Sequence, residues 1–392
     1  MRRSLTAEDA EFRDSLRTYF THEFPQDLRD KVRAGEPLTG EEIRRSHGIL
    51  AAAGLAVPGW PVEWGGRGWT PLQLHIWRTE LAAAGVPNPL PFNAVMIGPV
   101  IAAFGSQALK ERFLPPTATA EIWWSQGFSE PGSGSDLASL RTTAVRDGDE
   151  YIVNGQKTWT TLAQHSDWIF ALVRTDPNAP KKQQGISMLL IDMKSPGVTV
   201  RPIITLDDNH EVNEVHFDNV RVPADQLVGE ENKGWDYAKF LLGNERVGVA
   251  NTGLINRWIA ELKEHAQQVR RGDGSILDDP ANAARFVKLE TSALALELTA
   301  LRVAGGASTG GKPDPASSIL KLRASQLQQQ ILELGIDIAG PMALSWDEID
   351  GVPRWARRSV PTYLNYRKTT IYGGSSEVQR GIVAGTILGL KG

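Results

Sequence analysis

The sequence contains no cysteine, which excludes disulfide bonds, thiolate metal sites and a cysteine nucleophile. It also has no large excess of charge of one sign, because 42 basic and 46 acidic residues leave a net charge of only −4 at pH 7. We therefore expect no nucleic-acid partner, since a protein that binds polyanions carries a basic face. The seven histidines show no metal-ligand spacing, and we predict no metal site.

Long apolar runs are missing as well. The first residues, 1–6, lead directly into acidic, helix-like sequence without an apolar leader segment. No later segment has the length and apolarity of a membrane-spanning helix. We expect no export signal and no membrane insertion, and the lack of cysteine is compatible with a cytoplasmic location.

The chain is long enough for two or three globular domains, with 392 residues of which 41% are hydrophobic. Residues 1–118 have helical periodicity. Thr6 is a candidate N-cap, and Phe12, Leu16 and Phe20 follow it at helical spacing. These features predict an N-terminal helical domain.

The periodicity changes to two over residues 119–228, where short strand-like runs alternate with polar spacers. Asp-Gly at 147–148 and Asn-Gly at 154–155 are strong hairpin signals, so we predict a small antiparallel β-domain. Helical spacing returns over residues 229–392, which predicts a four-helix-bundle-like domain. The predicted fold class is multidomain α+β, with the β-domain in the centre of the chain.

The first chemical motif is the segment 124–136, Trp-Ser-Gln-Gly-Phe-Ser-Glu-Pro-Gly-Ser-Gly-Ser-Asp. Its clustered hydroxyls and glycine-rich backbone suit a polar heterocycle or a phosphate ester. It is not a dinucleotide-binding fingerprint, because the third glycine and the strand-to-helix setting are absent. From these residues alone, a binding turn is only slightly favoured over a plain loop.

The second motif is the segment 154–161, Asn-Gly-Gln-Lys-Thr-Trp-Thr-Thr. Trp159 and Thr161 are two residues apart in strand-like sequence, so we expect both side chains on one face. An indole can form an apolar wall for an isoalloxazine ring, and a hydroxyl can donate to a ring nitrogen. Taken alone, the fragment is more typical of a cross-strand packing pair.

The third motif is the segment 371–380, Ile-Tyr-Gly-Gly-Ser-Ser-Glu-Val-Gln-Arg. It resembles the flavin- and substrate-binding turn of the acyl-CoA dehydrogenase family, with Gly373 where many members carry their catalytic glutamate. The first motif resembles the family signature S/T-E-P-x-x-G-S-D, and the second follows it in the family's order and distance. The resemblance covers essentially the whole chain and is strongest at 123–161 and 371–380.

This resemblance implies FAD as the cofactor. It places Gln126, Phe128 and Ser129 at the flavin, with Ser129 and the adjacent backbone at the pyrimidine edge. It implies that Trp159 covers the ring and that Thr161 serves flavin N5. In the third motif, Ser375 and Glu377 match polar positions that contact FAD in relatives.

The resemblance also implies an acyl-CoA substrate. It assigns Ser135 to the pantetheine arm of CoA, and it adds Arg246, Gly373 and Gly374 to the substrate-binding residues. The backbone N–H of Gly373 is expected to donate to the thioester carbonyl, as the family's residue at that place does.

Because Gly373 has no side chain, the catalytic base must lie elsewhere. The resemblance points to Glu245, since a minority branch of the family places its glutamate at the corresponding helical position. Abstraction of an α-proton needs a partly desolvated carboxylate within hydrogen-bond reach of the carbon. Without the resemblance, a helical glutamate beside Arg246 is more often a solvated or salt-bridged surface residue.

One departure from the family concerns assembly. Many homotetrameric members hold the FAD pyrophosphate of a neighbouring subunit with an Arg-x-x-Phe-Gly segment, whereas this chain has Arg-Arg-Gly-Asp-Gly-Ser at 270–275. We therefore expect either a homo-oligomer or a heterotetramer with a related chain.

The leading prediction is dehydrogenation of an acyl-CoA to a trans-2-enoyl-CoA, with electrons passed to an electron-transfer flavoprotein. One alternative is a flavin-dependent monooxygenase or oxidase on the same fold, which would need no α-proton base. Another is a noncatalytic partner subunit of a heteromeric dehydrogenase. The sequence does not identify the acyl group. Linear, branched, cyclic and steroid-like groups all stay open.

Overall fold

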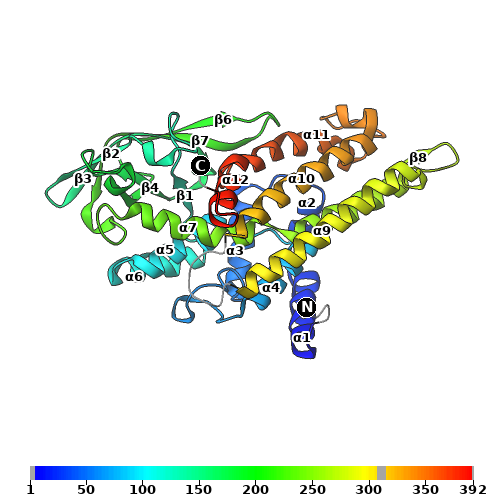
Figure 1. The fold of residues 1–392 in the computed structure, drawn as a ribbon, viewed down its shortest axis with the longest axis horizontal. Coiled ribbons are helices and arrows are strands. Elements are labelled where there is room, and N and C mark those ends of the chain that lie inside the picture. Colours follow the sequence, from blue (N-terminus) through cyan, green and yellow to red (C-terminus); the bar gives the residue numbers. More distant parts are fainter. Residues whose placement is uncertain (1–4, 307–314, 391–392) are drawn as a thin grey trace. The chain divides into compact units, whose positions relative to one another are not determined.

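The computed structural model describes residues 5–306 and 315–390, without the side chains of residues 242–249 and 304–306. The chain forms two compact units (Figure 1). The β unit comprises Gly40–Gly68 and Pro89–Glu245, and the helical unit comprises Met1–Thr39, Trp69–Asn88 and Arg246–Gly392. In chain order, N-terminal helices, a central β-sheet and C-terminal helices follow one another, which confirms the predicted fold class.

The β unit is built on one seven-stranded sheet. Its strands are β1 (Trp124–Gly127), β2 (Thr143–Asp147), β3 (Glu150–Thr161), β4 (Trp168–Arg174), β5 (Ile186–Asp192), β6 (Val198–Ile204) and β7 (His210–Pro223). The order is β1-β4-β2-β3-β7-β6, with β5 paired to β4. The helices of this unit are α3 (Gly40–Ala52), α5 (Gly98–Phe104), α6 (Gln107–Ala118) and most of α7 (Gly234–Val249).

Most strand pairs are antiparallel, as predicted, but β1 and β2 both pair with β4 in parallel. Hairpin signals identify only strands that are neighbours in sequence, so they do not predict these longer connections. The turn at Gly148 is confirmed, because Asp147 pairs with Glu150 across it and Gly148 has a left-handed φ of 59°.

The turn predicted at Asn154-Gly155 is wrong. Both residues lie inside β3, where the pairing with β7 shifts between Val153 and Gly155 and forms a bulge. Gly155 has a φ of 144°, and a Cβ added there would lie 2.6 Å from the hydroxyl of Thr142. Pairing along the whole strand therefore overrides the local Asn-Gly signal, and glycine allows the close approach.

Two strands of the sheet, β4 and β5, are buried almost throughout. Alternate residues of β4, Ile169 and Ala171, face one core together with Tyr151 and Val215. On the other side, Phe170 contacts the ring of Phe92 from the helical segment before α5, with centroids 6.4 Å apart. Continuous apolar sequence in these strands reflects cover on both faces.

His47 fastens α3 to the rest of the β unit. Its Nδ1 accepts a hydrogen bond from the Leu90 N–H at 3.0 Å, so the proton sits on Nε2, which lies 3.0 Å from the carbonyl oxygen of Ala118. Burial lowers the pKa of His47 to about 4, and the bond to Ala118 offsets only part of that effect. The neutral ring is therefore the form that the fold holds.

We predict an acid-sensitive contribution to stability from His47. Between pH 6.5 and about 4, His47 is protonated in the unfolded chain but neutral in the folded protein. Its contribution to the free energy of unfolding is therefore complete above pH 6.5 and is lost as the pH falls towards about 4. The loss is roughly 3 kcal/mol at about 1.4 kcal/mol per pKa unit. Urea unfolding at pH 7 and pH 4.5 should show a smaller change in the free energy of unfolding between the two pH values in His47→Gln than in wild type. Equal pH dependence in both proteins would contradict the assignment.

The helical unit contains α1 (Ala7–Thr18), α2 (Gln26–Arg33), α4 (Pro71–Ala83), α8 (Thr252–Gln268), α9 (Pro280–Gly306), α10 (Ser317–Ala339), α11 (Arg354–Tyr366) and α12 (Ser376–Thr386). The predicted N-cap is confirmed, because the Thr6 side chain accepts from the Asp9 N–H. Arg17 joins α1 to α4 by a bidentate pair with buried Glu80, at 2.9 and 3.0 Å. A short hairpin of β8 (Arg270–Arg271) and β9 (Gly274–Ser275) follows α8.

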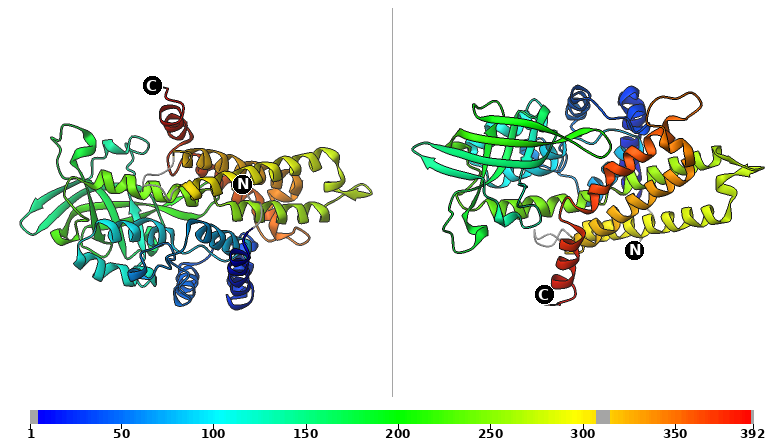
Figure 2. Two further views of the ribbon diagram at one scale, coloured as in Figure 1. Left: turned by 60° about the horizontal axis from the view of Figure 1, so that its bottom comes forward. Right: turned by 90° about the horizontal axis from the view of Figure 1, so that it is seen from above.

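Helices α8, α9, α10 and α11 form the predicted bundle, and Figure 2 shows the long helices side by side. Leu320, Leu327, Ile331 and Leu334 of α10 are buried in its core, together with residues of α8 and α9. Their spacing places them on one stripe of the helix. Within residues 5–306 and 315–390, no helix is long and apolar enough to cross a bilayer.

Candidate active site

The first motif begins in β1 and continues into a tight loop of the β unit. Gln126 is half-buried in β1, and Phe128 is buried with its ring edge-on to Phe170, centroids 5.8 Å apart. Ser129 is half-buried, whereas Ser135, the predicted pantetheine contact, is exposed. The loop therefore has a fixed base and an accessible tip.

Backbone contacts join this loop to the second motif. The N–H of Thr158 in β3 donates to the carbonyl oxygen of Ser129 at 2.9 Å. The ammonium of Lys157 donates to the carbonyl oxygen of Phe128 at 3.3 Å. The structure thus brings together two segments that are separate in sequence and that both carry predicted flavin contacts.

A buried ion pair lies beneath this junction. Lys157 Nζ is 2.7 Å from Glu130 Oε1, and the two side chains are only 0% and 7% exposed. The Glu130 carboxylate also accepts from the backbone N–H groups of Arg141 at 2.6 Å and Thr142 at 2.9 Å. Each charge is satisfied by hydrogen bonds as well as by its partner, which is the condition for burying an ion pair.

The pKa values of the pair follow from these contacts. Burial lowers the pKa of Lys157 to about 8, because Glu130 offsets only part of the desolvation. Burial alone would raise the pKa of Glu130, but Lys157 and the hydrogen bonds outweigh it and hold the pKa below its usual value. Both groups therefore carry their charges at neutral pH.

Trp159 leaves the buried face of β3 through a second bulge. The register with β7 shifts between Lys157 and Thr160, and Trp159 has a left-handed φ of 58°. Simple alternation would bury Trp159 beside Lys157, yet its indole is 61% exposed. Thr161 is half-buried, while Thr160 between them is buried. A bulky residue held at positive φ is strained, which is typical of functional positions.

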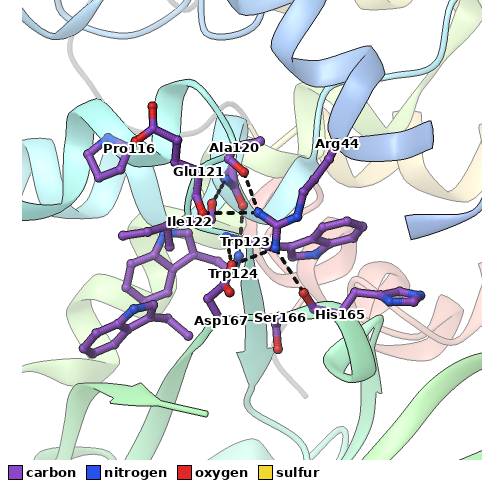
Figure 3. Close-up of polar contacts among 12 residues, drawn as sticks. Arg44, Pro116, Ala120, Glu121, Ile122, Trp123, Trp124, His165, Ser166 and Asp167 are labelled. Carbon is purple, nitrogen blue, oxygen red and sulfur yellow. Dashed lines mark hydrogen bonds and ion pairs between the residues drawn. The ribbon is translucent and has the colours of Figure 1, made fainter. Parts of the chain in front are cut away.

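The loop that follows β3 is held by Arg44 of α3, as Figure 3 shows. The guanidinium donates to the carbonyl oxygens of Ala120 at 2.6 Å and Glu121 at 3.2 Å. It also donates to Asp167 Oδ2 at 2.8 Å, and the same oxygen accepts from the Trp123 N–H at 2.9 Å. Arg44 therefore fixes the start of β1 to the end of the loop after β3.

The third motif forms a tight turn in the helical unit. Gly373 and Gly374 have left-handed φ values of 63° and 84°. Ser375 is the N-cap of α12, and its hydroxyl accepts from the Val378 N–H. Glu377 is exposed, and a hydrogen bond from its own backbone N–H, with further help from the Ser375 side chain, holds its pKa below the usual value.

The predicted base lies in α7. The backbone of Glu245 and that of Arg246 belong to this helix, as the sequence predicts. The side chains of both residues lie outside the described part of the chain. Among the described residues, no group of three or more histidine, aspartate or glutamate side chains forms a metal-binding cluster.

Comparison with known proteins identifies the family. The models for the acyl-CoA dehydrogenase N-terminal, middle and C-terminal domains match residues 6–121, 125–220 and 232–388. The chain belongs to the acyl-CoA dehydrogenase family. Members of this family are oxidoreductases and flavoproteins of lipid metabolism that generally use FAD.

Relatives and solved structures agree with this assignment. The acyl-CoA dehydrogenase IpdE1 of Mycobacterium tuberculosis is 38% identical over 89% of this chain and 88% of its own. The ChsE4-ChsE5 complex from the same organism contains a chain that is 33% identical, with a TM-score of 0.87 and full coverage of both chains. The Tcur3481-Tcur3483 steroid ACAD has 30% identity, a TM-score of 0.88 and full coverage of both chains.

The side chains of the β unit fit an isoalloxazine ring. In the described part of the chain, the Ser129 and Thr161 hydroxyls and the Gln126 amide make no hydrogen bond to protein, and the Trp159 indole is exposed. Polar groups without protein partners beside an accessible aromatic face can take a planar, polar heterocycle. The predicted flavin contacts Ser129, Trp159 and Thr161 thus have the chemistry that FAD would need, and their roles stay predictions.

Sequence reasoning missed the residues that support these contacts. Tyr151 and Val153 are apolar residues at alternate positions of β3, which marks the side of the strand that faces the core, and Lys157 lies at a position of the same alternation. A charged residue at a core-facing position indicates a buried residue of opposite charge, so the sequence pattern could have predicted an acidic partner for Lys157 such as Glu130. Arg44 and its acceptors gave no comparable signal, because most of those acceptors are backbone carbonyls.

We predict that the buried pair is needed for both stability and flavin retention. Lys157→Met should leave the Glu130 carboxylate buried without its ammonium and cost about 3–5 kcal/mol of unfolding free energy. It should also lower the flavin-to-protein absorbance ratio, because the Phe128 carbonyl loses its donor. Urea unfolding and the visible spectrum of the purified protein measure the two effects.

Two further proteins control this experiment. The double variant Glu130→Gln/Lys157→Met removes both charges and should recover most of the lost stability. Lys182→Met removes an exposed partner of Asp136 in the same unit and should change stability by less than about 0.5 kcal/mol. A Lys157→Met protein as stable and as yellow as wild type would refute the role of the pair.

Proposed function

We propose that this protein catalyses the FAD-dependent dehydrogenation of an acyl-CoA thioester to the trans-2-enoyl-CoA. In this reaction the α-carbon loses a proton, the β-carbon loses a hydride, and a carbon–carbon double bond forms between them. FAD, when bound, supplies the hydride acceptor. The observation that supports the proposal is the junction of the first two motifs, where the Thr158 N–H binds the Ser129 carbonyl and the exposed Trp159 and half-buried Thr161 follow in the same strand.

Glu245 is the proposed base for the α-proton. The third motif leaves no alternative carboxylate at position 373, since glycine stands there. A carboxylate on a helix can be held rigidly near its target, and partial desolvation would raise its basicity. Arg246 is proposed as a substrate-binding neighbour on the same helix.

Gly373 and its turn are proposed to bind the thioester. A backbone N–H survives the loss of the side chain and can donate to the thioester carbonyl as negative charge develops on it. Gly374 is a further substrate contact, Ser375 and Glu377 are flavin contacts, and Ser135 is the proposed contact of the pantetheine arm.

The electron acceptor and the assembly are also proposals. Electrons would pass to an electron-transfer flavoprotein, and the chain would work as a homo-oligomer or with a related chain. The heteromeric ChsE4-ChsE5 relative and the altered segment 270–275 favour a related partner chain. A steroid ACAD among the similar structures favours a polycyclic acyl group over a simple linear chain.

The proposed base gives a direct prediction. Glu245→Gln should keep its fold and flavin but lose turnover by several powers of ten, each factor of ten being about 1.4 kcal/mol of barrier, because the α-proton has no acceptor. Single-turnover flavin reduction by an acyl-CoA substrate measures the effect. Asp236→Asn is the matched control, since it neutralises an exposed carboxylate on the same helix and should retain normal rates. Near-normal reduction by Glu245→Gln would remove Glu245 as the base and show that another group takes the α-proton.

Moving the carboxylate back to position 373 should restore only part of the activity. Gly373 has a φ of 63°, and a side chain in this left-handed region costs about 1–2 kcal/mol. That cost corresponds to about 5- to 30-fold in rate, so the double variant Glu245→Gln/Gly373→Glu is expected to reduce flavin faster than Glu245→Gln but at least about fivefold more slowly than wild type. Recovery to wild-type rates would mean that the turn relaxes freely and that the glycine conformation is unimportant.

A further inference from the structure

Two buried side chains of the helical unit bind the carbonyl groups of the Gly373–Gly374 turn. Gln379 of α12 is 0% exposed, and its Nε2 donates to the carbonyl oxygen of Gly373 at 2.9 Å. Lys321 of α10 is also 0% exposed, and its Nζ donates to the carbonyl oxygen of Gly374 at 2.7 Å. Neither residue has a role in the reaction as described above.

These contacts set the direction of the neighbouring amides. In a planar trans peptide, the C=O and the following N–H point in opposite directions. The bond to the Gly373 carbonyl therefore turns the Gly374 N–H away from Gln379, and the bond to the Gly374 carbonyl turns the Ser375 N–H away from Lys321. In the described part of the chain, the N–H groups of Gly373, Gly374 and Ser375 donate to no acceptor.

Glycine at position 374 is required for this arrangement. Besides the left-handed φ of 84°, a Cβ at Gly374 would lie 2.5 Å from Gln379 Nε2. Any side chain there would displace the amide that holds the Gly373 carbonyl. Successive amide N–H groups in such a turn form a concave anion-binding surface.

The Gln379 amide is held at a cost to the fold. Its Oε1 is buried and has no hydrogen-bond partner in the described part of the chain. Flipping the amide does not help, because Oε1 would then face the Gly373 carbonyl, which can only accept. A buried acceptor without a partner destabilises a protein, so the bond from Nε2 to the Gly373 carbonyl is what holds the amide in this orientation.

We propose that Lys321 and Gln379 are positioning residues that aim the amide N–H groups of Gly374 and Ser375, beside that of Gly373, at the enolate oxygen of the thioester. The inference rests on the proposed function, and it extends the donor set from one amide to the whole turn. These donors stabilise the negative charge that forms on the thioester oxygen when the α-proton leaves.

The test measures how acidic a bound thioester becomes. The probe is acetoacetyl-CoA, whose enolate absorbs in the ultraviolet, and the quantity measured is its apparent pKa on the FAD-loaded protein. Wild type should lower this pKa relative to free acetoacetyl-CoA. Gln379→Met and Lys321→Met should weaken enolate stabilisation by about tenfold or more, less than the roughly 100-fold or larger effect of deleting a donor.

Each variant has a control for trivial effects. Gln379→Met changes no charge and removes the buried Oε1, so it should unfold at no lower temperature than wild type while losing enolate stabilisation. Lys321→Arg should restore part of the effect of Lys321→Met, because a donor and a charge return. Lys263→Met removes a half-exposed lysine of the same unit and should leave the enolate pKa unchanged.

The outcomes separate the two levels of the account. If wild type stabilises the enolate and folded Gln379→Met does so equally well, the positioning role is wrong and the proposed function stands. If wild type neither stabilises the enolate nor transfers electrons to FAD from any acyl-CoA, the proposed function fails and takes this inference with it. If Lys321→Met fails to fold, the result for Gln379→Met alone decides whether the positioning role is right.

Discussion

The buried ion pair of Lys157 and Glu130 is the interaction on which the β unit's ligand surface depends. Removing two charges from water costs free energy. Hydrogen bonds offset that cost here, because the Glu130 carboxylate also accepts from two backbone N–H groups and Lys157 also donates to a backbone carbonyl. The pair thereby ties a loop after β1 to the middle of β3. Trp159, two residues further along β3, is brought to the surface by a bulge that this attachment flanks.

The helical unit uses the same principle at its glycine turn. Lys321 and Gln379 are buried polar side chains whose partners are backbone carbonyls, and they define which way the amides of the turn point. In both units, side chains without any direct chemical role fix the backbone that is proposed to bind the ligand. Such supporting residues determine whether hydrogen-bond donors are held in place before the reaction begins. Donors positioned in advance account for much of the rate enhancement of enzymes.

The sequence predicted element types better than it predicted their connections. The stripe of Leu320, Leu327 and Ile331 identified a core helix because helical spacing depends only on local sequence. Asn154-Gly155 was misread as a turn, since pairing of β3 with β7 decides the conformation there and is not visible locally. The three motifs were found through the family resemblance, whereas Lys157 and Lys321 were missed because a positive charge in sequence usually indicates the surface. The domain boundaries at 118 and 228 remain predictions.

The central claim is that this chain binds FAD and oxidises an acyl-CoA. An anaerobic spectral titration tests it most directly, with the FAD-reconstituted protein, alone and with a candidate partner chain, against CoA thioesters with linear, branched and polycyclic acyl groups. The account predicts that the visible flavin absorbance bleaches in stoichiometric proportion with at least one thioester, most strongly in the polycyclic class, and that the enoyl-CoA appears. A protein that takes up no FAD, or whose flavin stays oxidised with every thioester, would contradict it.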